Sequence, residues 1–141
     1  MATPFVYKDA YLSIATNDLS AYLVSCETNI GYDEVDVKAM GDDCKHGIPG
    51  LQDWTITATF NQSFTAAELD SIISPLVGAA VASAIIFKPN GANTGTSNPK
   101  WTGNCRIYEY PVISGEVGSR GEATVTIRPG DGIGLVRGTS D

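Results

Sequence analysis

The clearest pattern along the chain is a regular alternation of apolar and polar residues between positions 53 and 62. Four apolar residues occupy alternate positions there, namely Trp54, Ile56, Ala58 and Phe60. Threonine and asparagine residues fill the positions between them. Successive side chains of a β-strand point to opposite sides of the sheet, so this segment predicts a strand with one buried and one polar face.

Shorter segments of the same kind predict further strands, whereas one segment has helical spacing. The strands are expected at residues 11–15, 22–32, 35–39, 82–88, 100–112 and 122–128, with a short one at 133–136. The segments 22–32 and 35–39 could form a hairpin turning near Gly31, or one long strand with a bulge there. Thr65 and Glu68 match a capping box, and the following apolar residues predict a helix that ends near Ser74. The chain is therefore predicted to be mainly β, a β-sandwich or open barrel with one flanking α-helix.

Two long polar loops, at about 41–51 and 89–99, interrupt the predicted strands. Loops of this length usually have a function or are disordered, and a loop that becomes ordered on a neighbouring subunit would satisfy both descriptions. The length of 141 residues fits one domain spanning 1–141, with a flexible N-terminal segment at about 1–9.

Composition argues against several classes of partner. The net charge is −7, from 9 basic and 16 acidic residues, which disfavours tight binding to nucleic acid or to an anionic membrane. No apolar segment is long enough to span a bilayer, so we expect no membrane anchor. The segment 1–11 lacks the features of a secretory signal, and the three cysteines are expected to be free thiols. A Cys26–Cys105 disulfide remains the alternative.

Candidate chemistry is sparse. The only histidine, His46, lies two residues from Cys44, and no third group suggests a catalytic unit. The nearby Asp42 and Asp43 lack the second ligand pair that a zinc site needs. The glycines at 115–121 do not match a phosphate-binding loop. We therefore predict no enzyme activity, no catalytic residue, no cofactor and no metal site.

Six short motifs, spread over most of the chain in a fixed order, resemble those of phage tail tube proteins, also called major tail proteins. They are the DLS at 18–20, the acidic strand and MGD at 34–42, the GLQDW at 50–54, the NP-x-aromatic-x-G at 98–103, the P-x-x-x-G-x-VG stretch at 111–118 and the closing segment at 132–137. No single motif is specific, but the ordered set is. Cys44 and His46 depart from the basic or small residues expected in the first loop.

The resemblance implies a structural virion protein that forms rings of six subunits, which stack into the hollow tail tube for genome delivery into a bacterial host. We expect self-association, other tail proteins (tape measure, tail terminator, baseplate or tip) as partners, and double-stranded DNA that passes through without specific binding. The protein would be made in the host bacterial cytoplasm and reside in the virion tail. The predicted inter-subunit or inter-ring contacts are Asp42, Asp43, Lys45, His46, Ile48, Pro49, Leu51, Asn98 and Pro99.

Two further hypotheses concern the lumen and an alternative function. The acidic balance suggests that some carboxylates line the lumen and repel DNA, with Asp33, Glu34 and Asp36 as candidates, although these acids could equally be solvated outer charges. The alternative function is a small β-sandwich binding module that attaches to a cell-surface glycan or protein. Its binding platform would be the aromatic residues Trp101, Tyr108 and Tyr110.

Overall fold

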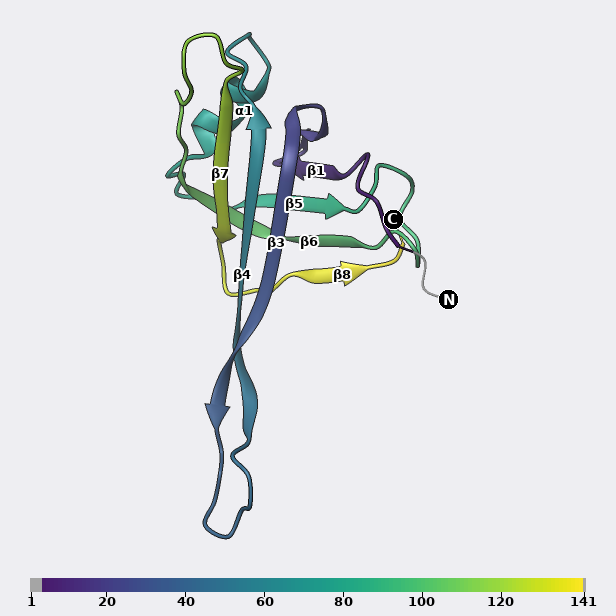
Figure 1. Ribbon diagram of the computed structural model, residues 1–141, viewed down its shortest axis with the longest axis vertical. Coiled ribbons are helices and arrows are strands. Elements are labelled where there is room, and N and C mark those ends of the chain that lie inside the picture. The colour runs from purple at the N-terminus through teal and green to yellow at the C-terminus, as the bar shows by residue number, and fades with distance from the viewer. Residues whose placement is uncertain (1–3, 141) are drawn as a thin grey trace.

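The computed structural model describes residues 4–140, which are built around one antiparallel sheet (Figure 1). The strands are β1 (Tyr11–Ile14), β2 (Asn17–Asp18), β3 (Leu23–Asp36), β4 (Gly47–Asn61), β5 (Ser83–Lys88), β6 (Lys100–Glu109), β7 (Glu122–Pro129) and β8 (Val136–Gly138). The helical elements are α1 (Leu69–Ile73) and the 3-10 turns η1 (Ser20–Tyr22) and η2 (Ser74–Leu76). The predicted mainly β fold with one α-helix is therefore confirmed. Residues 4–10 have no regular structure, and the first three residues of the expected flexible segment lie outside the described part.

The sheet is folded so that two groups of strands cross. The strand order is β2-β1-β5-β6-β7-β4-β3, and β8 pairs with the first residues of β6. In Figure 1, β3, β4 and β7 follow the long axis of the molecule, whereas β5, β6 and β8 run across it. Strand β6 belongs to both layers, because residues 101–105 pair with β5 and residues 105–109 pair with β7. Within residues 4–140, β3 pairs only with β4 and β2 only with β1, so the sheet is not closed.

The hydrophobic core lies between the crossing layers. The alternating residues Trp54, Ile56, Ala58 and Phe60 are all buried, as the sequence pattern predicts. They form one apolar cluster with residues from the other strands and from α1, including Leu12, Leu69, Ile85, Ile107 and Ile127. Full burial of one large aliphatic or aromatic side chain stabilises a fold by about 1.5–3 kcal/mol, so this cluster is the main source of stability.

The hairpin between β3 and β4 is longer than the sequence suggests. Of the two alternatives for residues 22–39, the structure has one continuous strand to Asp36, with a register shift between Tyr32 and Glu34. The predicted loop at 41–51 is displaced to residues 37–46, because β3 ends at Asp36 and β4 already begins at Gly47. A Cβ atom on Gly47 would lie 2.6 Å from Cγ of Glu34 and 2.8 Å from the backbone oxygen of Val35. Glycine is thus needed here for close strand approach, not for a loop.

The helix differs from its prediction at one end only. It begins at Leu69, with Glu68 as an N-cap residue that makes no side-chain capping bond, so the capping box is wrong. The preceding Ala67 has a φ of 64°, a left-handed conformation that prevents the helix from starting earlier. Leu69 and Ile73 are buried, and the helix ends at Ile73, as expected from Pro75.

The C-terminal strand was also predicted two to three residues too early. It covers Val136–Gly138, where it pairs with the start of β6, and Leu135 before it is buried in the core. The described residues include no helix long and apolar enough to cross a bilayer.

Candidate assembly surfaces

The hairpin formed by β3 and β4 projects far beyond the core (Figure 1). We call its outer part, residues 33–51, the hairpin extension. Every residue in it is exposed apart from Gly50, which is half-buried. Met40, Leu51 and Ile48 are 103%, 83% and 53% exposed. A long exposed strand pair that carries large apolar side chains is unusual in a monomeric protein, so the hairpin extension is a candidate contact surface.

The contact residues predicted in the first loop all lie on the hairpin extension. The turn carries Asp42, Asp43, Lys45 and His46, and the first part of β4 carries Ile48, Pro49 and Leu51. Asp42 shapes the turn, because its Oδ2 accepts a 2.7 Å hydrogen bond from the backbone nitrogen of Ala39. The same oxygen lies 3.7 Å from Nδ1 of His46. These contacts hold the backbone of the turn in one conformation, with its charged residues exposed.

The second long loop is organised by Asn98, which is only 6% exposed. Its Nδ2 donates hydrogen bonds to the backbone oxygens of Asn90, Ala92 and Asn93 over 3.0–3.3 Å. Its Oδ1 accepts one from the backbone nitrogen of Asn90. The Asn98 amide therefore holds the loop together, and the contact role of Asn98 and Pro99 stays a prediction.

The three candidate lumen acids do not share one face. Asp33 lines a shallow hollow together with Asp53 and Thr55. Glu34 and Asp36 occupy the alternate positions of β3, so their side chains point to the opposite side of the strand. The structure thus groups Asp33 with the polar residues of β4 and separates it from the other two.

A continuous polar face covers β3, β4 and β7 on the side away from the core. It includes Glu27, Asn29, Asp33, Asp53, Thr55, Thr57, Thr59, Asn61, Glu122, Thr124, Thr126 and Arg128, with Arg106 of β6 beside Arg128. Hydroxyl groups pair across the strands, since Oγ1 of Thr59 lies 3.1 Å from Oγ1 of Thr124. The sequence predicted the polar side of β4 alone, because strand neighbours cannot be read from one strand.

Both arginines on the polar face are engaged by protein groups. Nη2 of Arg128 donates to both carboxylate oxygens of Asp53, over 3.0 and 3.2 Å, and its Nη1 donates to Oγ1 of Thr55. Nη2 of Arg106 donates to the backbone oxygen of Ala80 over 2.9 Å. Four carboxylates (Glu27, Asp33, Asp53 and Glu122) accompany these two guanidinium groups, so the face has an acidic balance.

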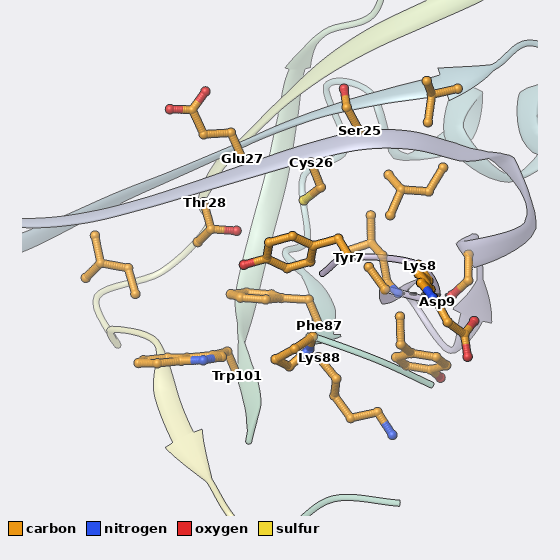
Figure 2. A pocket seen from close by; sticks show the side chains of 18 residues that line it. Tyr7, Lys8, Asp9, Ser25, Cys26, Glu27, Thr28, Phe87, Lys88 and Trp101 are labelled. Carbon is orange, nitrogen blue, oxygen red and sulfur yellow. Dashed lines mark hydrogen bonds between the residues drawn. The ribbon is translucent and has the colours of Figure 1, made fainter. Parts of the chain in front are cut away.

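A cleft of about 730 Å³ separates β3 from the crossing strands β1, β5 and β6. We call it the β3 cleft. Figure 2 shows Tyr7, Cys26, Thr28, Phe87 and Trp101 turned toward it, whereas Glu27 and Ser25 point away. The rings of Phe87 and Trp101 are stacked, with centroids 6.4 Å apart and planes 8° apart. The cleft is therefore an aromatic surface at the open edge of the sheet.

The three cysteines are unpaired, so the Cys26–Cys105 disulfide is absent and the expectation of free thiols holds in the structure. Cys26 and Cys44 are exposed, whereas Cys105 is buried. Burial raises the pKa of the Cys105 thiol from 9.0 to about 12. Burial of the sulfur also raises the pKa of Cys26, and a hydrogen bond with Thr28 partly offsets the effect.

The aromatic residues proposed for a binding module do not form one platform. Trp101 faces the β3 cleft, whereas Tyr108 is 60% exposed and lies at a register shift of β6, next to the buried Ile107. The hydroxyl of Tyr110 accepts a hydrogen bond from Gln62 and donates one to Asp70. Desolvation is the largest cause that raises the pKa of Tyr110. Three tyrosine and tryptophan rings that point in different directions cannot stack on one sugar ring.

The described residues offer no acid–base or metal-binding constellation. No group of three or more histidine, cysteine, aspartate or glutamate side chains within 4–140 is placed to hold a metal ion. Nδ1 of His46 lies 3.7 Å from Oδ2 of Asp42, and both groups lie in an exposed turn.

Comparisons with known proteins identify the fold. No protein-family model matches the sequence, and a comparison with curated proteins finds no match. Among solved structures, the SPP1 tail tube has a TM-score of 0.74 at 14% identity, covering 98% of this chain and 81% of that chain. The PVC sheath-tube complex of an extracellular contractile injection system has a TM-score of 0.67 at 16% identity, with 96% and 92% covered.

A third solved structure is the tail of an empty GTA particle, obtained with C6 symmetry. It has a TM-score of 0.63 at 11% identity, and the match covers 89% of this chain and 93% of that chain. The protein described here therefore has the fold of tail tube proteins, as the resemblance of its motifs implies.

Proposed function

We propose that the protein is a structural virion protein, and not an enzyme, that polymerises into the hollow tail tube of a long-tailed bacteriophage. The fold shared with tail tubes and the hairpin extension together carry this proposal. The subunits would form hexameric rings that stack along the tail. The C6 symmetry of the GTA tail supports six subunits per ring.

The open edge of the sheet supports ring formation. Strand β3 has 14 residues and pairs with β4 alone within the described chain. Unpaired backbone groups along such an edge readily pair with another strand, and closure into a barrel removes the edge. In the proposed ring, β3 of one subunit joins the layer formed by β4, β7 and β6 of the next, so that the open edge of β3 is covered by a neighbour.

The polar face is the surface that would line the conduit. It lies on the opposite side of β4 from the core, and its carboxylates outnumber its guanidinium groups. DNA carries about one negative charge per 1.7 Å of duplex, so a basic lining would retain it. Six subunits of charge −7 give −42 per ring (6 × −7), and part of this charge would repel the passing genome. Double-stranded DNA would then pass without specific binding.

The remaining partners follow from a tail tube role. Open stacking of rings through unlike surfaces does not limit its own length, so an external ruler and a terminator are required. We therefore propose a tape measure, a tail terminator and a baseplate or tip protein as partners. The protein would be made in the host bacterial cytoplasm and reside in the virion tail.

Negative-stain electron microscopy of the purified protein across a concentration series tests the proposal. We expect hollow tubes or six-fold rings above a threshold concentration, because head-to-tail polymerisation is concentration-dependent. Monomers that persist at the highest concentration, even with phage tail extract added as a source of initiator, would refute the tube. That result would favour the binding module, which a glycan screen with the monomer would then examine.

A further inference from the structure

We propose that the β3 cleft is the seat for the hairpin extension of a neighbouring copy of this chain. The inference rests on the proposed tube, and it names the receiving surface that the tube requires. The occupant is the turn of the hairpin extension, residues 39–46, with the apolar residues beside it. Three observations support this contact: the apolar side chains of the two surfaces, their opposite charges and the reach of the hairpin extension.

The apolar match comes first. The hairpin extension exposes Met40, Ile48 and Leu51, whereas the β3 cleft presents the stacked rings of Phe87 and Trp101. Large exposed apolar patches on a soluble protein usually mark contact sites. Methionine and branched aliphatic side chains pack readily on aromatic rings, so contact between the two surfaces removes both from water.

The charges are also complementary. The hairpin extension has five carboxylates (Asp33, Glu34, Asp36, Asp42 and Asp43) and two ammonium groups (Lys38 and Lys45), a balance of −3 without His46. Around the β3 cleft, Lys8 and Lys88 line the wall, and Arg137 pairs with Trp101 in register and so shares its face. Asp9 also lines the cleft, but the side chain of Glu27 points away from it.

These basic groups are not neutralised by ion pairs. Within residues 4–140, the ion pairs involve other residues, and none includes Lys8, Lys88 or Arg137. Nζ of Lys88 lies 4.7 Å from the centre of the Tyr11 ring and donates to the backbone oxygen of Ala92. Opposite charges on two surfaces steer the encounter and set the register of the contact.

The hairpin extension is also long enough for such a contact. The hairpin extension reaches from residue 33 to a turn near Met40, about 25 Å at roughly 3.3 Å per residue. A projection of this length allows the turn to reach a neighbouring subunit. The cleft of about 730 Å³ is open to the outside and is formed by the same edge strand that leads into the hairpin.

Two native thiols make the proposal directly testable. Cys44 lies in the turn of the hairpin extension, and Cys26 points into the β3 cleft (Figure 2). Seating the turn in the cleft brings these thiols of two copies within reach of a short bis-maleimide. Each thiol adds across one maleimide double bond, its sulfur bonding to carbon and its proton passing to the adjacent carbon, so no oxidant is needed.

The experiment uses assembled tubes of the full chain, treated with the bis-maleimide and separated on a denaturing gel. We expect a covalent dimer joined through Cys26 and Cys44, identified by mass spectrometry of the linked peptides. The dimer should disappear in Cys26→Ser and in Cys44→Ser, and it should persist in Cys105→Ala. A dimer that survives in Cys26→Ser, or no Cys26–Cys44 link in wild-type tubes, overturns the proposal.

A charge reversal gives an independent readout. Arg137→Glu should raise the threshold concentration for assembly about tenfold, equivalent to a loss of about 1.4 kcal/mol per contact. Adding Asp43→Lys in the same chain should restore assembly, because the pair is reversed. The matched control is Arg120→Glu, an equal charge change at an exposed residue away from the cleft. Equal thresholds for Arg137→Glu and Arg120→Glu would overturn the proposed seat.

Tubes that form regardless of these changes refute only the seat, whereas a wild-type chain that forms no tubes refutes the proposed function.

Discussion

Removal of the hairpin extension should separate folding from assembly. Tyr32 and Gln52 are register partners on β3 and β4, so residues 33–51 can be replaced by Asn-Gly, which forms a tight two-residue turn. The trimmed chain keeps the hydrogen bond from Nε2 of Gln52 to the hydroxyl of Tyr32. It also keeps the bond from the backbone nitrogen of Leu135 to Oε1 of Gln52. The trim therefore preserves the links that join β3, β4 and the C-terminal segment.

The expected magnitudes differ sharply between the two properties. Because the removed residues are exposed, with Gly50 alone half-buried, the free energy of unfolding should change by only about 1 kcal/mol. For assembly, the exposed parts of Val35, Val37, Met40, Ile48 and Leu51 amount to about three whole side chains. Burying them would contribute about 5–9 kcal/mol per subunit before association costs. Even a third of this value corresponds to more than a tenfold rise in threshold concentration.

Two measurements on the same samples check this prediction. Urea denaturation, followed by tryptophan fluorescence, compares the stability of the trimmed and wild-type chains. Sedimentation and negative-stain microscopy compare their threshold concentrations for tube formation. The reasoning is refuted if the trimmed chain forms tubes at the wild-type threshold. An unfolded trimmed chain would instead show that the hairpin extension contributes to the fold itself, contrary to its exposure.

Two further predictions concern titration and the lumen. Because the pKa of Cys105 is about 12 in the folded chain and 9.0 when unfolded, the neutral thiol stabilises the fold below pH 9, and this contribution falls by about 1.4 kcal/mol per unit as the pH rises from 9 toward 12. Cys105→Ala should therefore lose stability less steeply in urea titrations across this range, and parallel curves for the two proteins would contradict the assignment. Replacing the candidate lumen acids Asp33, Glu34 and Asp36 by lysine should slow genome ejection from the tubes that form, and the reversed charge of the hairpin extension should also raise the threshold concentration for assembly. Asp33→Lys alone should account for most of the delay, since it shares the polar face, and phages that eject DNA at the normal rate would rule this out.

Local patterns predicted the elements whose period was unambiguous. The alternation at 53–62 correctly marked Trp54 and Phe60 as core residues, because a strand with one polar side has only one way to bury the other. The helix was found but its start was misplaced, since the backbone at Ala67 departs from helical geometry. The predicted loop at 41–51 includes Gly47 and Gly50, although in β4 these glycines permit close contact with β3. This role of glycine depends on the neighbouring strand, so the sequence around the glycine does not reveal it.

Some residues of the candidate assembly surfaces were predictable from the sequence, and others were not. The turn residues Asp42 and His46 were predicted from composition and do lie at an exposed tip. The polar face and the β3 cleft were not predicted, because each combines residues from three or more segments. The amide of Asn98 also holds its own loop together, a role that only the converging backbone oxygens reveal, and its predicted contact stays a prediction.

The sequence by itself determined the β class, the buried side of the central strand, the acidic balance and the resemblance to tail tube proteins. These properties depend on residue type and short-range spacing, which one chain displays directly. Tertiary structure alone decided that β6 passes between two crossing layers, that β3 remains an open edge and that the hairpin continues beyond the core. Strand pairing joins residues that are distant in sequence, and many pairings satisfy the same alternation. Only packing of the complete core selects among them, and with that choice the surfaces available for assembly are set.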